Sequence, residues 1–117
     1  MDTLKLVLKR HYFDMITKGN KREEYREITP YWAARLSLIS KTGAGRDLEG
    51  PQLVNLMREY SATYMLKWWN RVTFYMGYAK SRPQATYAVE AITVGMGRPE
   101  WGAVPGKEYF IIKFREL

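Results

Sequence analysis

Three ionisable side chains in the segment Gly19-Asn20-Lys21-Arg22-Glu23-Glu24-Tyr25-Arg26 have the chemistry of a nucleotide site. The guanidinium of Arg26 can bind a phosphate, or the acceptor edge of a base, through two parallel hydrogen bonds. The carboxylate of Glu24 can accept from an exocyclic amine, and the ammonium of Lys21 supplies a compact positive charge for a phosphate or sugar oxygen. We therefore consider these three residues as one wall of a nucleotide-sized pocket.

A second interpretation of the same charges is purely structural. Glu23 or Glu24 could neutralise the neighbouring cations on a solvated strand, where each exposed ion pair contributes only ~0–1 kcal/mol. Arg22 and Glu23 are expected to be surface residues. The residues alone leave both interpretations open.

Aromatic rings near this segment could stack on a base, a contact worth ~1–3 kcal/mol. The candidates are Tyr31, Trp32 and Tyr78. A site of this kind would read a single nucleotide in an unpaired segment, which is how RNA is usually recognised.

Basic residues elsewhere could form a rim that steers a polyanion toward the site, or could be scattered solubility charges. They are Lys9, Lys80, Arg82 and Arg98. His11 is expected to cap or pack at a junction rather than to catalyse, and Trp101 is expected to seal the edge of the core.

The composition leaves two hypotheses equally open, a nucleic-acid partner and a basic, aromatic-rich core with no polyanion partner, and it argues against metal chemistry. The net charge is +7 and aromatic residues make up 15% of the chain, values typical of proteins that bind polyanions and stack bases. With no cysteine and one histidine, and no carboxylate spacing like that of a calcium loop, we expect no metal and no cofactor. No signal peptide or long apolar run is evident, which predicts a soluble, cytoplasmic protein without a membrane partner.

The elements that must position the site can be read from periodicity. Alternation in Leu4–Lys9 predicts a strand that carries Lys9 beside the core, and a short helix over His11–Lys18 should end at a left-handed Gly19. Strand geometry over Lys21–Arg26 would send Arg22, Glu24 and Arg26 to one face and Lys21, Glu23 and Tyr25 to the other. Thr29 and Pro30 then predict the cap and first turn of a helix that runs to Leu36.

The rest of the chain predicts a loop, another helix and a series of strands. Residues 41–50 are glycine-rich, and apolar spacing after Pro51 indicates a helix that reaches Tyr64. Of the adjacent Trp68 and Trp69, one should be buried and the other partly exposed, because neighbours cannot share a face. Alternation predicts strands at 72–78, 86–92 and 110–115, with turns at 81–83 and 95–99. One domain over 1–117, a small barrel with helices at its ends, is expected.

Several of these segments together resemble the ASCH domain, a branch of the PUA-like superfamily. They are Leu6-Val7-Leu8-Lys9, Tyr12-Phe13-Asp14-Met15-Ile16, the segment Gly19–Arg26 continuing into Thr29-Pro30-Tyr31-Trp32, Val72–Tyr78, and Ile92–Gly97 with Pro99-Glu100-Trp101-Gly102. The similarity spans nearly the whole chain except about 41–69, which resembles a variable helical insertion. The resemblance implies an α+β fold, a PUA-like β-barrel of five or six strands with two or three helices. It also implies binding of RNA or a modified nucleoside, in a small protein of the bacterial or phage type.

The resemblance leaves the enzymatic question open. Some ASCH proteins are amidohydrolases that deacylate a modified cytidine with a lysine, a threonine nucleophile and a glutamate. Lys21 matches that lysine, but Glu24 occupies the place of the threonine, and a carboxylate cannot simply replace a hydroxyl as acyl acceptor. Binding is therefore the first hypothesis. A hydrolase with Lys21 and Glu24 as a proton-transfer pair is the second, and a protein-interaction module built around Trp68 and Trp69 is the third.

Overall fold

A computed structural model of the chain describes residues 2–37, 48–63 and 69–117. In these residues the order of elements is β1 (Thr3–Leu8), α1 (Arg10–Thr17), β2 (Glu23–Glu27), α2 (Pro30–Leu36), α4 (Gly50–Thr63), β3 (Arg71–Met76), β4 (Gln84–Met96), a short 3-10 helix (Pro99–Trp101) and β5 (Glu108–Arg115).

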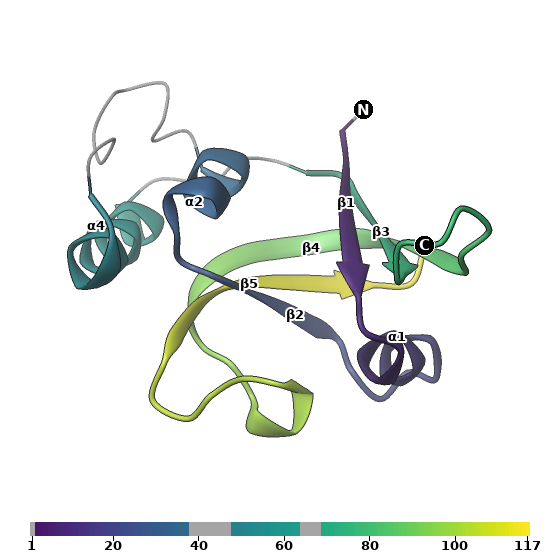
Figure 1. The fold of residues 1–117 in the computed structure, drawn as a ribbon. Coiled ribbons are helices and arrows are strands. Elements are labelled where there is room, and N and C mark those ends of the chain that lie inside the picture. The colour runs from purple at the N-terminus through teal and green to yellow at the C-terminus, as the bar shows by residue number, and fades with distance from the viewer. Residues whose placement is uncertain (1, 38–47, 64–68) are drawn as a thin grey trace.

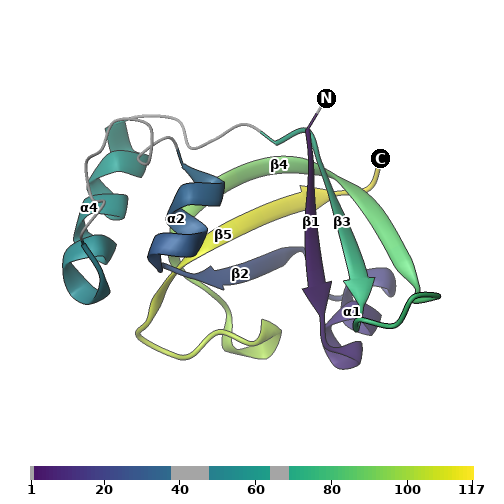
Figure 2. The ribbon, with the colours of Figure 1, turned by 45° about the horizontal axis from the view of Figure 1, so that its top comes forward.

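The strands form one curled sheet that resembles half of a barrel (Figure 1). The strand order is β1-β3-β4-β5-β2, with β1 and β3 parallel and the other neighbours antiparallel. Because β1 and β2 are the two edges of the described sheet, its curl turns them toward each other across an open seam. Figure 2 shows α1 at one end of the sheet and α2 with α4 at the other.

The core lies on the concave side of the sheet. The alternating residues Leu4, Leu6 and Leu8 of β1 are all buried, as the period-two pattern requires. Phe74 of β3 and Phe110 of β5 are fully buried, and burying a side chain of this size contributes roughly 1.5–3 kcal/mol. The helices add Phe13 and Ile16 from α1, Ala33 and Leu36 from α2, and Leu53 and Met57 from α4.

Two local features, the ending of α1 and the N-terminal cap of α2, position the segment between these helices. At the end of α1, the amide of Gly19 donates to the carbonyl of Ile16 and that of Asn20 to the carbonyl of Met15, a helix ending that needs a left-handed residue. Gly19 has φ +81°, as the sequence predicts. At the start of α2, the hydroxyl of Thr29 accepts from the amide of Trp32, which confirms the predicted cap.

The expected α+β fold on a small barrel-like sheet is confirmed at this level. The predicted turn at 95–99 is wrong in its first two residues, because Gly95 and Met96 pair with Tyr109 and Glu108 and extend β4. The register shifts between Val89 and Ala91, and such a bulge bends a strand enough to let it follow a strongly curved sheet. Residues 41–47 of the predicted loop at 41–50 lie outside the described residues, as do residues 64–68 of the predicted insertion at 41–69, which include Trp68. The described part of that insertion contains α4.

No helix in the described ranges combines the length and the apolar character needed to cross a bilayer.

Candidate functional site

The register between β2 and β5 directs two charged side chains toward the core side of the sheet. Glu24 stands opposite Ile112, and Arg26 stands opposite Phe110. Both apolar partners belong to the buried core, and directly opposed residues of an antiparallel pair project to the same face. Glu24 and Arg26 therefore occupy positions where a strand ordinarily carries apolar residues.

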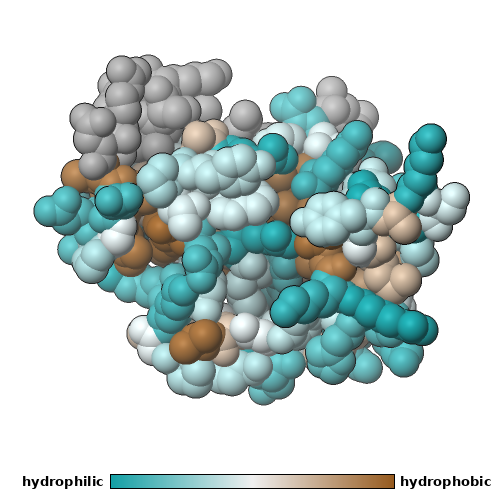
Figure 3. All heavy atoms as spheres, in the orientation of Figure 1, coloured by the Kyte–Doolittle hydropathy of each residue, from teal (hydrophilic) through white to brown (hydrophobic). Residues whose placement is uncertain are grey.

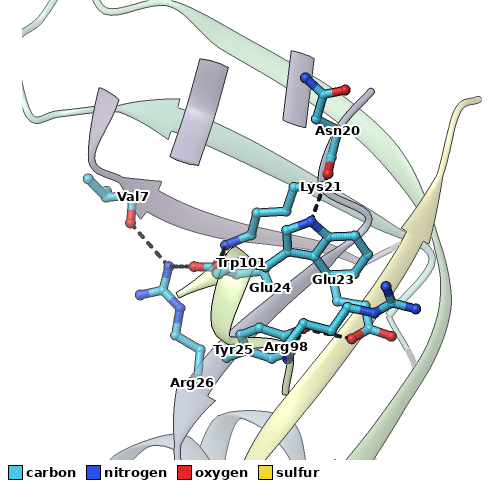
Figure 4. A network of polar contacts seen from close by, with 9 residues as sticks. All are labelled: Val7, Asn20, Lys21, Glu23, Glu24, Tyr25, Arg26, Arg98 and Trp101. Carbon is cyan, nitrogen blue, oxygen red and sulfur yellow. Dashed lines mark hydrogen bonds and ion pairs between the residues drawn. The ribbon is translucent and has the colours of Figure 1, made fainter. Parts of the chain in front are cut away.

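Lys21 joins Glu24 from the turn that precedes β2. Its Nζ lies 2.9 Å from Oε1 of Glu24 and donates to the carbonyl oxygen of Trp101 at 2.7 Å (Figure 4). Lys21 is 2% exposed and Glu24 is 7% exposed. The alternation that placed Lys21 opposite to Glu24 was wrong, because β2 begins only at Glu23. A buried charge is tolerated when it is paired, and each of these two residues supplies the other's partner.

Arg26 completes the cluster and connects the two edge strands. Its Nη2 donates to Oε2 of Glu24 at 2.8 Å and to the carbonyl oxygen of Val7 in β1 at 3.1 Å (Figure 4). The side chain is 20% exposed, and its buried Nε has no hydrogen-bond partner among the described residues. The guanidinium thus spans the open seam between β1 and β2. Its hydrogen bond to Glu24 fixes its orientation.

The loop 97–106 covers the cluster on one side. Besides the bond from Lys21 to the Trp101 carbonyl, the indole Nε1 of Trp101 donates to the carbonyl of Asn20 at 2.7 Å. The amide of Val104 donates to the hydroxyl of Tyr109 at 3.0 Å. Trp101, expected to be a core-edge residue, therefore holds this loop against the turn that carries Lys21.

Tyr25 anchors the same loop from the opposite face of β2. Its hydroxyl donates to Oε1 of Glu23 at 2.8 Å and accepts from the amide of Arg98 at 2.9 Å. Burial, which disfavours the phenolate, raises the pKa of Tyr25 well above its ordinary value, so the hydroxyl stays protonated. Gly97 packs directly on this ring, since a Cβ there would come within 2.6 Å of it.

An aromatic corner adjoins Arg26. Its guanidinium carbon lies 5.1 Å from the ring centroid of Trp32, within the range of a cation–π contact. Tyr31 meets Trp32 edge-on at 5.0 Å between centroids and is 61% exposed. The guanidinium of Arg35 lies 5.8 Å from the Tyr31 ring and 5.7 Å from the Trp32 ring. We call Arg26, Tyr31, Trp32 and Arg35 the seam surface.

The two remaining predicted ligand residues lie together at the far end of β1 and β3. The amide of Gly77 donates to the carbonyl of Leu8, which brings the segments that carry Tyr78 and Lys9 side by side. Both residues are exposed, and Tyr78 is 85% exposed. Neither side chain forms a hydrogen bond, ion pair or ring contact with Lys21, Glu24 or Arg26 in the described structure, so their part in a site stays a prediction.

The predicted basic rim is divided between two places: Lys80 and Arg82 lie in the turn between β3 and β4, near the segment that carries Lys9, and Arg98 lies in the loop after β4. Arg82 donates to the carbonyl of Gly77 and lies 4.1 Å from the Tyr75 ring centroid, while Arg98 lies 4.7 Å from the ring of Trp101. Lys80 is exposed in the turn after β3. His11 is exposed and packs edge-on against Tyr12, a packing position of the kind expected.

Sequence reasoning missed two kinds of participant. The ring centroid of Tyr12 lies 4.2 Å from Nζ of Lys21, but an aromatic residue in a short helix indicates by its spacing only core packing. The carbonyl groups of Val7 and Trp101 are acceptors in the cluster, but backbone groups carry no side-chain signal. Only the fold brings them to Lys21 and Arg26.

The face shown in Figure 3 gives little support to an apolar docking surface. Hydrophobic atoms there form small separate patches within a largely hydrophilic surface. The large exposed hydrophobic residues of the described chain are Tyr31, Tyr78, Met96, Val104 and Leu117. Trp69 is half-buried, and its indole donates to the carbonyl of Arg35 at 3.3 Å, so it ties the chain to α2.

Within the described ranges, no group of three or more histidine, cysteine and carboxylate residues is arranged to hold a metal ion. No family model, no curated protein and no solved structure matches the chain. What the geometry itself defines is an α+β half-barrel with a buried Lys–Glu–Arg cluster at its seam. Such a cluster can hold a guanidinium in a fixed orientation, or exchange a proton between Lys21 and Glu24.

Proposed function

We propose that the chain is an ASCH-type member of the PUA-like superfamily and that it binds single-stranded RNA of the cytoplasm, or a nucleoside within it, at the seam surface. The curled sheet supports the fold part of this proposal. The segment Gly19–Arg26, one of those that carry the resemblance, forms the turn and strand that hold the buried cluster. The net charge of +7 supports a polyanionic partner.

One observation carries the functional part: Arg26 is fixed by Glu24 and Val7 beside the rings of Trp32 and Tyr31. A base can stack on the exposed Tyr31 ring while Arg26 or Arg35 binds the adjoining phosphate or base edge. A guanidinium that is already oriented loses little side-chain entropy when it binds. Lys21 does not contact the ligand in this proposal, because it is buried and bonded within the protein. It fixes Glu24, which orients Arg26.

The proposal is tested by the fluorescence anisotropy of a short labelled single-stranded RNA. Replacement Tyr31→Ala removes an exposed ring and should weaken binding by roughly 5- to 150-fold, the equivalent of ~1–3 kcal/mol of stacking. Replacement Arg26→Lys keeps the charge but loses the planar donors, and should also weaken binding. Affinity should fall steeply as salt rises.

Arg71→Gln is the matched control. Arg71 is exposed at the start of β3 and pairs with Thr3, so it lies four residues along β1 from Val7, roughly 13 Å. Losing this charge should change affinity far less than losing Tyr31. Binding that is absent, insensitive to salt, or equally reduced by Arg71→Gln would overturn the proposal.

A second candidate, a hydrolase that acts on a modified nucleoside or RNA, rests on the buried Lys21–Glu24 pair at 2.9 Å. A lysine and a carboxylate in contact can pass a proton to and from a hydrolytic water. Purified protein incubated with acylated cytidines and with RNA should then release product, and Glu24→Gln should abolish the release. Failure to release product from any of these substrates counts against this candidate and leaves the binding proposal untouched.

A further inference from the structure

A separate hollow opens at the end of the half-barrel that α1 covers. It has a volume of about 320 Å³, a size within the range of small-molecule sites. Its walls come from the end of α1 and the following turn, from β4, and from the last residues of β5. Figure 1 shows the end of β5 and α1 at the same end of the sheet. We call this hollow the α1-end pocket.

Apolar and aromatic groups form the inner wall of the α1-end pocket. Ile16 and Phe114 are almost completely buried core residues. Tyr87 is half-buried, and its ring lies 5.2 Å from that of Phe114 between centroids. A flat apolar group entering the pocket would therefore meet rings and a branched aliphatic side chain.

The rim of the pocket carries two exposed guanidinium groups, those of Arg22 and Arg115. Neither forms an ion pair or a side-chain hydrogen bond with any residue in the described parts of the chain, whereas Arg26 and Arg58 both do. Arg22 is nevertheless fixed at its backbone, because its carbonyl accepts from the amide of Phe114 at 3.3 Å. Two arginines at one mouth can bind an anion from two sides.

Among the described residues that line the pocket, Glu116 is the one carboxylate. Together with burial, its charge raises the pKa of the Tyr87 hydroxyl, so this group is a neutral donor at ordinary pH. Lys21 also lines the pocket, but it is buried and paired with Glu24. The two exposed guanidiniums and one carboxylate leave a net positive charge at the mouth. This positive charge at the mouth therefore favours a ligand with a net negative charge over a zwitterion.

We propose that the α1-end pocket binds a single nucleoside monophosphate, with its base against Tyr87 and Phe114 and its phosphate between Arg22 and Arg115. The pocket has the size of one such molecule rather than of a strand. Glu116 can accept a hydrogen bond from a sugar hydroxyl of the nucleotide. A ligand that is only an aromatic carboxylate has no such hydroxyl. The inference does not rest on RNA binding at the seam surface, because the two sites use different arginines and different rings.

The test uses the whole chain and isothermal titration with four nucleoside monophosphates, inorganic phosphate, benzoate and phenylalanine. At least one nucleotide should bind, at least tenfold more tightly than phosphate, benzoate or phenylalanine. Replacement Arg115→Gln should weaken that binding by at least tenfold, and Arg22→Gln should act in the same direction. Both side chains are exposed, so both variants should fold, which circular dichroism would check.

Lys107→Gln is the matched control, because Lys107 is exposed just before β5 begins and Arg115 is the last residue of that strand. The two lie roughly 26 Å apart along the strand, and the control should bind the nucleotide as the wild type does. Tyr31→Ala should also leave nucleotide binding intact, which separates this site from the seam surface. Four results would each overturn the proposal: no nucleotide binding, binding of phosphate as tight as that of the nucleotide, tighter binding of phenylalanine or benzoate, or equal loss with Lys107→Gln.

Discussion

At the scale of single residues, the cluster at the seam is defined by the burial of its charges. Lys21 and Glu24 are 2% and 7% exposed, and Glu24 accepts from both Lys21 and Arg26. One carboxylate thus serves two cations, and the carbonyl groups of Trp101 and Val7 accept from the same cations. The loss of Glu24 would leave both cations without their only carboxylate partner among the described residues.

Replacement Glu24→Gln is therefore expected to reduce the free energy of unfolding by about 3–5 kcal/mol, the usual cost of removing one member of a buried pair. Urea denaturation followed by circular dichroism measures this change. The control is Glu27→Gln, in the same strand, whose exposed carboxylate pairs with Lys107; it should change stability by less than about 1 kcal/mol.

The double variant Lys21→Met with Glu24→Gln makes the test specific to the pair. If Glu24→Gln destabilises the fold because it leaves the buried ammonium of Lys21 unpaired, then removing that ammonium should recover part of the lost stability. A double variant as unstable as the sum of the two single variants would contradict this account.

At the scale of elements, the loop 97–106 packs on β2 and on the turn before it, beside the cluster. The sequence predicted the elements that lead to this contact, because the caps at Gly19 and Thr29 and the alternation in β1 are local signals. It could not predict that Lys21 shares a side with Glu24, since that depends on where β2 begins. It also gave the segment 95–99 as a turn, because glycine and proline are turn residues and the pairing of Gly95 with Tyr109 is a long-range contact.

Two glycines of this region offer a matched pair of substitutions. A Cβ at Gly97 would lie 2.6 Å from the Tyr25 ring and 2.8 Å from Ala103, whereas one at Gly95 would meet only Ile111 at 3.5 Å. Gly97→Ala should destabilise the fold by roughly 1–3 kcal/mol, the usual cost of overpacking, and Gly95→Ala should be close to neutral. Thermal and urea unfolding would measure both, and equal stability of the two variants would show that the loop does not pack on Tyr25 as described.

At the scale of the whole molecule, an ion pair between separate elements links α4 to the sheet. Arg58 of α4 forms two hydrogen bonds to the carboxylate of Glu108 in β5, and a shallow groove lies between the starts of α2 and α4 beside this pair. The two binding proposals use different surfaces, the seam surface beside α2 and the α1-end pocket, and Lys21, which lines the pocket, also pairs with Glu24 of the buried cluster. A site at each end would let a basic half-barrel of 117 residues contact two ligands at once.

The pair between Arg58 and Glu108 predicts a pH dependence of stability. Hydrogen bonding from Arg58 lowers the pKa of Glu108 below its ordinary value of 4.5. Since the carboxylate is more acidic in the folded state, the pair stabilises the fold above the unfolded pKa and loses this effect as the pH falls through the folded pKa. Glu108→Gln should therefore lower the melting temperature at pH 7, and the difference from wild type should shrink as the pH is taken well below 4.5. Glu90→Gln, at an exposed position on β4, should track the wild type at every pH, and a Glu108→Gln difference that persists undiminished in acid would contradict the attachment of α4 through this pair.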